Sequence, residues 1–192
     1  MRILIVGVGA IGTHVVYALR NQPGLVLVDR DSVESRNTKN QLHPTQVVGR
    51  NKAEAARLTL RSQFGITVES IPADLRPTNT PHILKGADLV IDCLDNAKSR
   101  RIVRDVAEQF NIPVLHVGIS ADTSAGFVSW TLPDDDETAS GLPIPPTCQD
   151  PTLLPTYVFL AGAAAFCATR WLRYSTKEEY RLLANEIWTL RK

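Results

Sequence analysis

The stretch RILIVGVGAIG, at residues 2–12, decides the fold. A short apolar run leads into a glycine-rich turn, and apolar residues then recur at helical spacing over 11–19. A Pro-Gly pair ends that helix, and a second apolar run at 25–28 stops at Asp29. The pattern predicts a strand, a tight turn, a helix and a second strand, which together make one βαβ unit.

Helices and strands are predicted to alternate along most of the remaining chain. Strands are expected at 66–71, 87–94, 113–118 and 125–131, and helices at 51–63 and 97–111. The segment ADLVIDCL, at 87–94, is almost continuously apolar, which is typical of a parallel sheet covered by helices on both faces. This order of elements predicts an α/β fold with a doubly wound, mainly parallel sheet, whose ligands bind beyond the carboxyl ends of the strands.

Residues 133–155 differ from the rest of the chain. They hold half of the twelve prolines, an acidic run and Cys148. A loop of this length is uncommon inside a domain, and we expect it to be a crossover loop. An apolar helix is expected at 156–173, and the tail EEYRLLANEIWTLRK fits a helix or an edge strand. The chain is predicted to be one domain over 1–192, with 156–192 as its C-terminal elements.

The composition excludes several classes of protein. Of the 192 residues, 44% are hydrophobic and 21% are charged, which is typical of a folded globular protein. A formal net charge of +1 predicts that neither nucleic acid nor a membrane surface is a partner. The sequence shows no signal peptide and no membrane-spanning run, so we expect a cytoplasmic protein. The three cysteines and four histidines lack the spacing of a disulfide framework or a zinc site.

The glycine-rich turn has the spacing of a nucleotide-binding loop. Gly7, Gly9 and Gly12 allow a tight turn, a close approach of phosphate and close packing of the helix, whose N-terminal amides then face the anion. Asp29 closes the second strand, where an acid accepts hydrogen bonds from a ribose. Taken alone, these residues favour an NAD(P)-dependent oxidoreductase. A purely turn-forming role for the glycines is the other alternative.

Three further motifs point to a different class of nucleotide enzyme. They read DRDSVESRNTKNQLH at 29–43, GRNKAEA at 49–55 and DCLDNAKSR at 92–100. In order and spacing they resemble the nucleotide site of the ThiF/MoeB/HesA family, which is similar to ubiquitin-activating enzymes, and the resemblance extends over residues 2–131. It implies a Rossmann-like ThiF/MoeB-type fold. It also implies an adenylyltransferase that uses ATP and Mg2+ to activate the C-terminal carboxylate of a small ubiquitin-like or sulfur-carrier protein.

The resemblance assigns roles to individual residues. Lys52 matches the lysine that contacts the triphosphate, and Asp95 matches the acid associated with magnesium. These two residues are therefore the implied catalytic residues in the nucleotide site, with Asp95 as the metal ligand. The implied nucleotide-binding residues are Gly7, Gly9, Gly12, Asp29, Asn37, Asn40, Lys52 and Arg100.

Elementary electrostatics supports such roles for Lys52 and Asp95. When a carboxylate attacks an α-phosphorus, two anions approach each other, so the site needs cations, amide groups and a metal. The alternatives are structural: Asp95 would cap a helix that begins near Ala97, and Lys52 would be a solvated lysine in a first helical turn. Asp92, three residues before Asp95, is expected inside the strand, where it caps or pairs.

Two departures from the family pattern keep other functions open. Asn40 stands where the family has an arginine, and Arg36, Lys39 or Arg50 are candidates for supplying that charge. The first strand begins at residue 2, so we expect that a partner protein, in a homodimer or a hetero-oligomer, completes the site in place of the family's N-terminal segment. The alternatives are the NAD(P)-dependent oxidoreductase and a non-catalytic, activating-enzyme-like binding subunit.

Cys148 is the candidate catalytic cysteine. It lies in IPPTCQDPTLLP at 144–155, where the family often has a cysteine in a crossover loop. Such a thiol would receive the activated acyl group or form an acyl disulfide, provided that its neighbours lower its pKa. An incidental loop cysteine is the alternative. Cys93 lies in a predicted strand and Cys167 on an apolar helix, so both are expected in the core.

Overall fold

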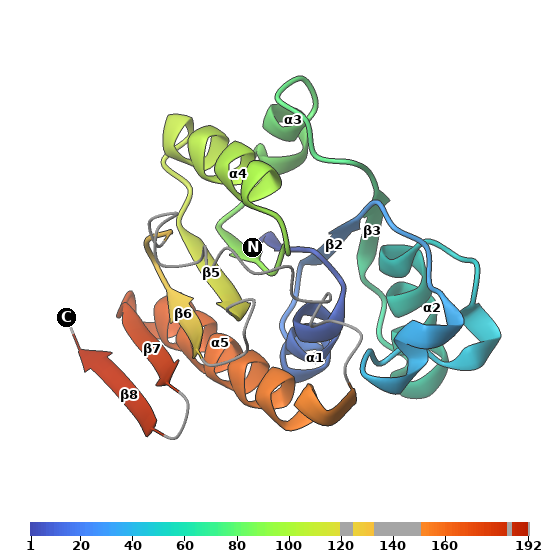
Figure 1. Ribbon diagram of the computed structural model, residues 1–192. Helices are drawn as coiled ribbons and strands as arrows, with labels where there is room; N and C mark the ends of the chain where they lie inside the picture. The colour runs from blue at the N-terminus through green and yellow to red at the C-terminus, as the bar shows by residue number, and fades with distance from the viewer. Residues whose placement is uncertain (120–124, 133–150, 184–185, 192) are drawn as a thin grey trace.

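A single sheet of eight strands runs through the computed structural model, which describes residues 1–119, 125–132, 151–183 and 186–191 (Figure 1). The strands are β1 Ile3–Val6, β2 Leu25–Asp29, β3 Glu69–Pro72, β4 Leu89–Asp92, β5 Val114–Ile119, β6 Ala125–Ser129, β7 Glu178–Leu183 and β8 Glu186–Arg191. Their spatial order is β3-β2-β1-β4-β5-β6-β7-β8. Strands β1 to β5 run parallel, and β6, β7 and β8 extend the sheet by antiparallel pairing. The predicted doubly wound, mainly parallel α/β fold is confirmed.

The two faces of the sheet carry different helices. The described helices are α1 Ala10–Leu19, α2 Lys52–Phe64, α3 Thr80–Leu84, α4 Ala97–Gln109 and α5 Leu154–Tyr174. Helices α1, α2 and α5 pack on one face, and α3 and α4 pack on the other (Figure 1). In β1, Ile3 and Ile5 face the first layer, whereas Leu4 and Val6 face the second. Burial of both faces explains why the central strands are continuously apolar, and each such side chain contributes about 1.5–3 kcal/mol.

The polar segment between β2 and α2 folds as two short 3-10 helices, η1 Ser35–Lys39 and η2 Thr45–Val47. Two backbone hydrogen bonds of the buried Val33 join the beginning of this segment to its end. The Val33 amide donates to the carbonyl oxygen of Arg50 at 2.8 Å, and the Val33 carbonyl accepts from the amide of Gly49 at 2.8 Å. The chain therefore returns to the end of β2, and α2 begins there.

Several elements differ from the sequence-based prediction in their bounds. Strand β3 begins at Glu69 rather than 66, because Gly65 ends α2 with φ +69° and the amide of Ile66 still bonds to the carbonyl of Leu60. The sequence pattern misses α3, since five residues are too few to show a helical repeat. Helix α5 begins at Leu154, inside the segment expected to be a loop.

The C-terminal tail forms the edge strands β7 and β8, which resolves the choice that its sequence pattern leaves open. Strand β7 pairs with β6, and the buried Glu179 of β7 adds side-chain contacts between them. Glu179 accepts hydrogen bonds from the Ser129 hydroxyl and the Trp130 amide. Residues 133–150, with Cys148, lie outside the described residues, so the crossover loop and the single domain over 1–192 stay predictions. None of the described helices is long and apolar enough to cross a membrane.

Candidate functional site

The carboxyl ends of β2, β1 and β4 meet at one edge of the sheet. Val28, Val6 and Asp92 are partners in adjacent strands, so the chain leaves all three strands at the same level. The glycine-rich loop follows β1, Asp29 ends β2, and Asp95 comes shortly after β4. Because ligands of doubly wound sheets bind at this edge, it is the candidate site.

The glycine-rich loop is packed too closely for side chains at two of its positions. Gly7 has φ +85°, and a Cβ there would lie 2.8 Å from the carbonyl oxygen of Cys93. A Cβ on Gly12 would lie 1.8 Å from the carbonyl oxygen of Gly7. By contrast, a Cβ built on Gly9 would have no described heavy atom within 4 Å beyond those of the adjoining backbone. The fold therefore requires glycine at Gly7 and Gly12, whereas the bare backbone at Gly9 leaves room for a ligand.

The N-terminus of α1 follows this loop directly. Gly9 is its N-cap residue, and no side chain among the described residues caps the helix. The first backbone amides of an α-helix have no partner within the helix and carry a partial positive charge. They are therefore available to a phosphate group.

Asp29 is tied to the loops on both sides of it. Its Oδ2 accepts the amide of Val8 at 2.6 Å, and its Oδ1 accepts the amide of Asp31 at 2.8 Å. Burial raises the pKa of Asp29, while these two amides and the charge of Lys52 act in the opposite direction. Each carboxylate oxygen has a second lone pair, so Asp29 retains acceptor capacity for a ribose hydroxyl.

Asn51 fastens the start of α2 to the end of β2. Its side-chain amide donates to the carbonyl oxygens of Asp29 at 2.9 Å and Asp31 at 3.2 Å. Its Oδ1 accepts the amides of Ala53 and Glu54, so Asn51 is also the N-cap of α2. This double role places Lys52, the first residue of α2, beside Asp29.

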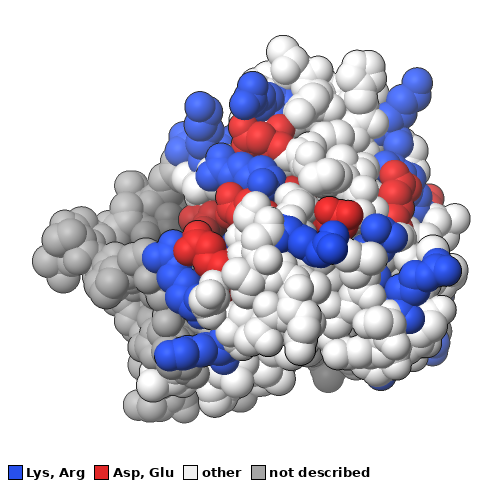
Figure 2. Space-filling model, turned by 90° about the vertical axis from the view of Figure 1, so that its right-hand side faces the viewer, with Lys and Arg blue, Asp and Glu red and all other residues white. Residues whose placement is uncertain are grey.

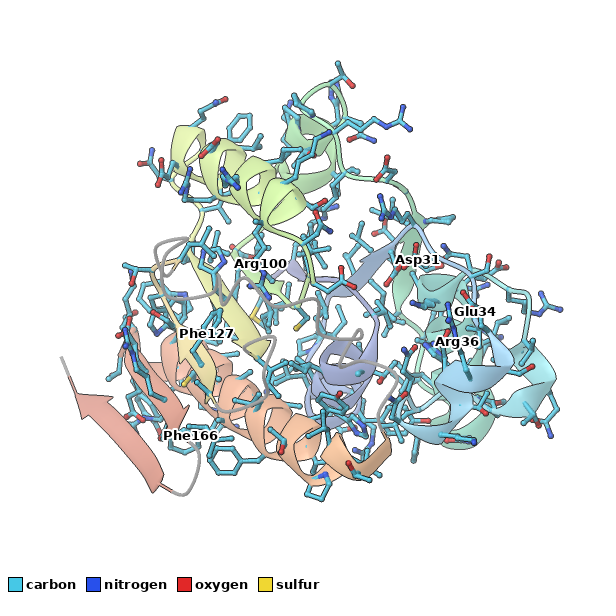
Figure 3. The ribbon with its side chains drawn as sticks, in the orientation of Figure 1. Asp31, Glu34, Arg36, Arg100, Phe127 and Phe166 are labelled. Atoms are coloured by element: carbon cyan, nitrogen blue, oxygen red, sulfur yellow. The ribbon has the colours of Figure 1, made fainter. Side chains whose placement is uncertain are left out.

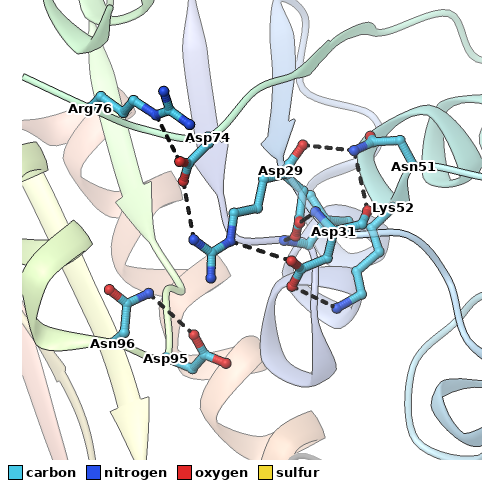
Figure 4. A network of polar contacts seen from close by, with 10 residues as sticks. Asp29, Asp31, Asn51, Lys52, Asp74, Arg76, Asp95 and Asn96 are labelled. Atoms are coloured by element: carbon cyan, nitrogen blue, oxygen red, sulfur yellow. Dashed lines mark hydrogen bonds and ion pairs between the residues drawn. The ribbon is translucent and has the colours of Figure 1, made fainter. Parts of the chain in front are cut away.

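Lys52 belongs to a chain of ion pairs at the same edge (Figure 4). Its Nζ lies 3.3 Å from Oδ2 of Asp31, and Arg30 joins Asp31 to Asp74 with distances of 3.4 and 3.2 Å. The Lys52 side chain is only 12% exposed, so it is not the solvated lysine of the structural alternative. Acidic and basic side chains are interspersed on the face drawn in Figure 2. Sequence reasoning missed Asp31, although its spacing of two from Asp29 was an available signal.

Asp95 is exposed and lies three residues beyond the end of β4. It is not the N-cap of α4: that residue is Asn96, whose Oδ1 accepts the amide of Ser99 at 2.9 Å. The side-chain amide of Asn96 also donates to Oδ1 of Asp95 at 3.4 Å. The helix-capping alternative for Asp95 is therefore wrong, and its carboxylate is left at the ligand-binding edge.

A buried polar cluster lies at the carboxyl end of β4. Oδ2 of Asp92 is 2.7 Å from Nδ1 of His116 and 3.2 Å from Nη1 of Arg100, and Oδ1 of Asp92 accepts the amide of Leu94 at 2.9 Å. Nη2 of Arg100 donates to the carbonyl oxygen of Val117 at 2.6 Å. The expectation that Asp92 lies within its strand and pairs is confirmed. Sequence reasoning missed His116, because its partner is 24 residues away.

The cluster determines where Arg100 points. Its guanidinium lies 5.6 Å from the ring centre of Phe127, which Figure 3 labels beside it. Burial by itself would raise the pKa of Asp92, but the charge of Arg100 and the hydrogen bond from His116 outweigh it, and the pKa is lowered. The guanidinium of Arg100 is thus paired with Asp92. A contact between Arg100 and a nucleotide stays a prediction.

The two asparagines of the polar segment are both buried. Oδ1 of Asn37 accepts the amide of Glu34 at 3.0 Å and so holds the start of η1. The carbonyl oxygen of Asn40 lies 3.3 Å from Nε2 of His14. Arg36, a candidate for the missing charge, pairs with Glu34 (Figure 3) at 2.6 Å. Nucleotide contacts for Asn37 and Asn40 stay predictions.

Comparison with known sequences identifies the family. The pattern of the ThiF family matches residues 1–190. The chain belongs to the ThiF family. The adenylyltransferase and sulfurtransferase UBA4 of Meyerozyma guilliermondii is 37% identical over 116 residues, which cover 58% of this chain and 27% of that protein. The SAMP-activating enzyme E1 of Haloferax volcanii is 33% identical over 122 residues, 62% of this chain and 45% of that protein. The matched region thus spans less than half of these relatives.

Solved structures share the fold of this ThiF-family chain. A crystal structure of E. coli MccB with AMPCPP and MccA has a TM-score of 0.77 at 19% identity, and the match covers 99% of this chain and 63% of that one. PaaA has a TM-score of 0.73 at 19% identity, with 100% and 63% covered. At this identity the likeness concerns the fold.

The two described cysteines of the ThiF-family chain lie in protected positions. Cys167 is buried on α5, and burial together with the charge of Glu178 raises its pKa to about 12. Burial also raises the pKa of Cys93, which lies half-buried after β4. Both thiols are therefore poor nucleophiles near neutral pH. Cys148 lies outside the described residues.

Proposed function

We propose that this chain is an ATP-dependent adenylyltransferase that activates the C-terminal carboxylate of a small ubiquitin-like or sulfur-carrier protein. In the reaction a carboxylate oxygen attacks the α-phosphorus, the bond from that phosphorus to the oxygen bridging to the β-phosphate breaks, and pyrophosphate leaves. The observation that carries the proposal is the placement of Lys52, beside Asp29 and Asp31, at the edge where the glycine-rich loop emerges. The activities in the names of the relatives UBA4 and the SAMP-activating enzyme agree with it.

Each residue at the edge has a separate task in this reaction. The amides at the start of α1 hold phosphate oxygens, and Asp29 accepts hydrogen bonds from the ribose. The ammonium of Lys52 exchanges Asp31 for the triphosphate and neutralises negative charge as the two anions approach. Asn51 fixes the first turn of α2 to β2, so the backbone of Lys52 is already positioned before the nucleotide binds.

The donor set fits a magnesium ion that arrives with the nucleotide. Asp95 offers an exposed carboxylate at the site, and Asp31 offers a second one. No group of three or more potential metal ligands exists among the described residues. Mg2+ typically binds one or two carboxylates together with substrate phosphates, so a complete protein cage is not required. When bound, Mg2+ would neutralise phosphate charge, and Asp95 would hold it.

Further steps and assembly belong to the same proposal. Cys148 accepts the acyl group: its thiolate attacks the acyl carbon, a thioester forms, and AMP leaves. A homodimer or a hetero-oligomer completes the site, and the protein works in the cytoplasm as a single adenylation domain over 1–192. The carrier protein is the substrate partner, with neither nucleic acid nor a membrane involved.

Isothermal titration calorimetry with magnesium-ATP and with NAD tests the proposal. We expect ATP to bind and NAD to bind at least tenfold more weakly, because Lys52 meets triphosphate charge that NAD lacks. Tight NAD binding without ATP binding would replace the proposal by the NAD(P)-dependent oxidoreductase. ATP binding without ATP–pyrophosphate exchange in the presence of the carrier would indicate the non-catalytic binding subunit.

A further inference from the structure

The segment after η1 is docked on the glycine-rich loop and on α1. The amide of Leu42 donates to the hydroxyl of Thr13 at 3.3 Å. Nε2 of His43 lies 3.2 Å from the carbonyl oxygen of Val8. His43 is only 3% exposed, so this contact is inside the protein. The polar segment therefore supports the phosphate-binding loop from its buried side.

The partner of His43 determines which ring nitrogen carries the hydrogen. A carbonyl oxygen only accepts hydrogen bonds, so Nε2 of His43 must be the donor to Val8. Burial, together with the charge of Lys52, lowers the pKa of His43 to about 4, and the ring is therefore neutral at pH 7. Its Nδ1 is buried and has no hydrogen-bond partner among the described residues. His43 therefore acts as a neutral donor of one hydrogen bond. It carries no positive charge that would attract a phosphate.

The bond to His43 fixes the direction of the next amide. In a trans peptide the carbonyl and the following N–H point in opposite directions, and the chain contains no cis peptide among its described residues. With the Val8 carbonyl directed toward His43, the N–H of Gly9 points away from it. The amide of Val8 itself is held by Asp29 at 2.6 Å. Both peptide units that flank Val8 are therefore held by side chains.

We propose that His43 is a positioning residue for the phosphate-binding loop: its Nε2–H holds the Val8 carbonyl and thereby aims the Gly9 amide at a phosphate of the bound nucleotide. Among Gly7, Gly9 and Gly12, Gly9 is the position where an added Cβ would meet open space, so a phosphate can approach the backbone there. A leucine at position 43 would fill the space without donating. Glutamine places an amide N–H where Nε2 lies. The inference rests on the proposed nucleotide function and concerns how this chain prepares its site.

The tautomer of His43 can be measured without any nucleotide. Long-range 1H–15N NMR on the 15N-labelled protein should show His43 with a protonated Nε2 and an unprotonated Nδ1 at pH 7, the signals being assigned by their loss in His43→Gln. A protonated Nδ1 with a bare Nε2 would overturn the proposal. Because no ATP is present, this result stands or falls independently of the adenylation function.

Calorimetry with magnesium-ATP then tests the positioning role. We expect His43→Leu to bind ATP about tenfold more weakly, His43→Gln to stay within about threefold of wild type, and the exposed His82→Leu in α3 to match wild type. Wild-type affinity in His43→Leu, or a tenfold loss in His43→Gln, would overturn the proposal. If His43→Leu does not fold, the ATP affinity of His43→Gln and the tautomer of His43 still test the proposal. A wild-type protein that binds no ATP would overturn both the aiming of Gly9 and the proposed function, whatever the tautomer.

Discussion

The Nζ atom of Lys52 lies 3.3 Å from Oδ2 of Asp31, and the lysine is almost fully enclosed. Lys52 is thus held at the candidate site by an acid that a triphosphate can replace. We expect Lys52→Met to lower ATP–pyrophosphate exchange at least ~100-fold, since the loss of one electrostatic contact to a transition state costs roughly 3 kcal/mol. The measurement is the exchange of labelled pyrophosphate into ATP, with the carrier protein present.

Lys98→Met is the matched control for that experiment. Lys98 is an exposed lysine on α4, and its replacement should leave exchange unchanged. Exchange that survives in Lys52→Met at the level of this control would show that the Lys52–Asp31 pair is only structural.

Asp95 and Asn96 are adjacent, yet we expect their substitutions to have different effects. Asp95→Asn should lose at least ~100-fold in exchange and keep its stability, because Asp95 does not cap α4. Asn96→Ala removes the cap and should lower the free energy of unfolding by about 0.5–2 kcal/mol. Urea unfolding and pyrophosphate exchange measure the two effects. Near-normal exchange by a folded Asp95→Asn protein would remove Asp95 from the reaction.

Asp92 should make stability depend on pH in the acid range. Its pKa in the folded protein lies below the ordinary 3.8, so the folded state binds fewer protons than the unfolded state in that range. The contribution of the ionised Asp92 to the free energy of unfolding is therefore fully present above pH 3.8. It is lost as the pH falls through the pKa that Asp92 has in the folded protein. Because the carboxylate is buried with Arg100 and His116, Asp92→Asn should cost about 3–5 kcal/mol at pH 7.

Urea unfolding of wild type and Asp92→Asn at pH 7 and at pH 3 checks this expectation. The difference in stability should shrink at the lower pH. Asp105→Asn, on the exposed side of α4, serves as the control and should leave stability unchanged at both pH values. If the free energies of unfolding of wild type and Asp92→Asn differ by the same amount at both pH values, the lowered pKa of Asp92 is contradicted.

Cys148 should be the thiol that iodoacetamide labels first near neutral pH. Burial raises the pKa of both Cys93 and Cys167, so few of these thiols are ionised. Mass spectrometry of the labelled protein identifies the site. We further expect Cys148→Ala to keep pyrophosphate exchange and to lose the thiol-linked carrier adduct. If the variant forms that adduct as well as wild type does, Cys148 takes no part and the acyl-adenylate passes directly to another protein.

The sequence by itself determined the central part of the fold and the edge where the site lies. The apolar runs of β1, β2 and β4 and the glycines between β1 and α1 are local signals, and parallel strands bring their carboxyl ends to one edge. Asp29 was accessible to sequence reasoning because it closes a strand whose end is visible in the pattern, whereas Lys52 was assigned through the resemblance of GRNKAEA to the family's motif.

The tertiary structure decided the contacts between segments that are distant in sequence. The direction of Arg100 depends on His116 and Asp92, which come from two different strands, and His43 reaches Val8 across 35 residues. Strand β7 exists because β6 offers an open edge, so the tail pattern alone could not separate strand from helix. The physical reason is the same in each case. Local patterns report which face of an element is apolar, whereas the partner of a buried polar group is chosen only when the elements pack and that group must find a hydrogen bond.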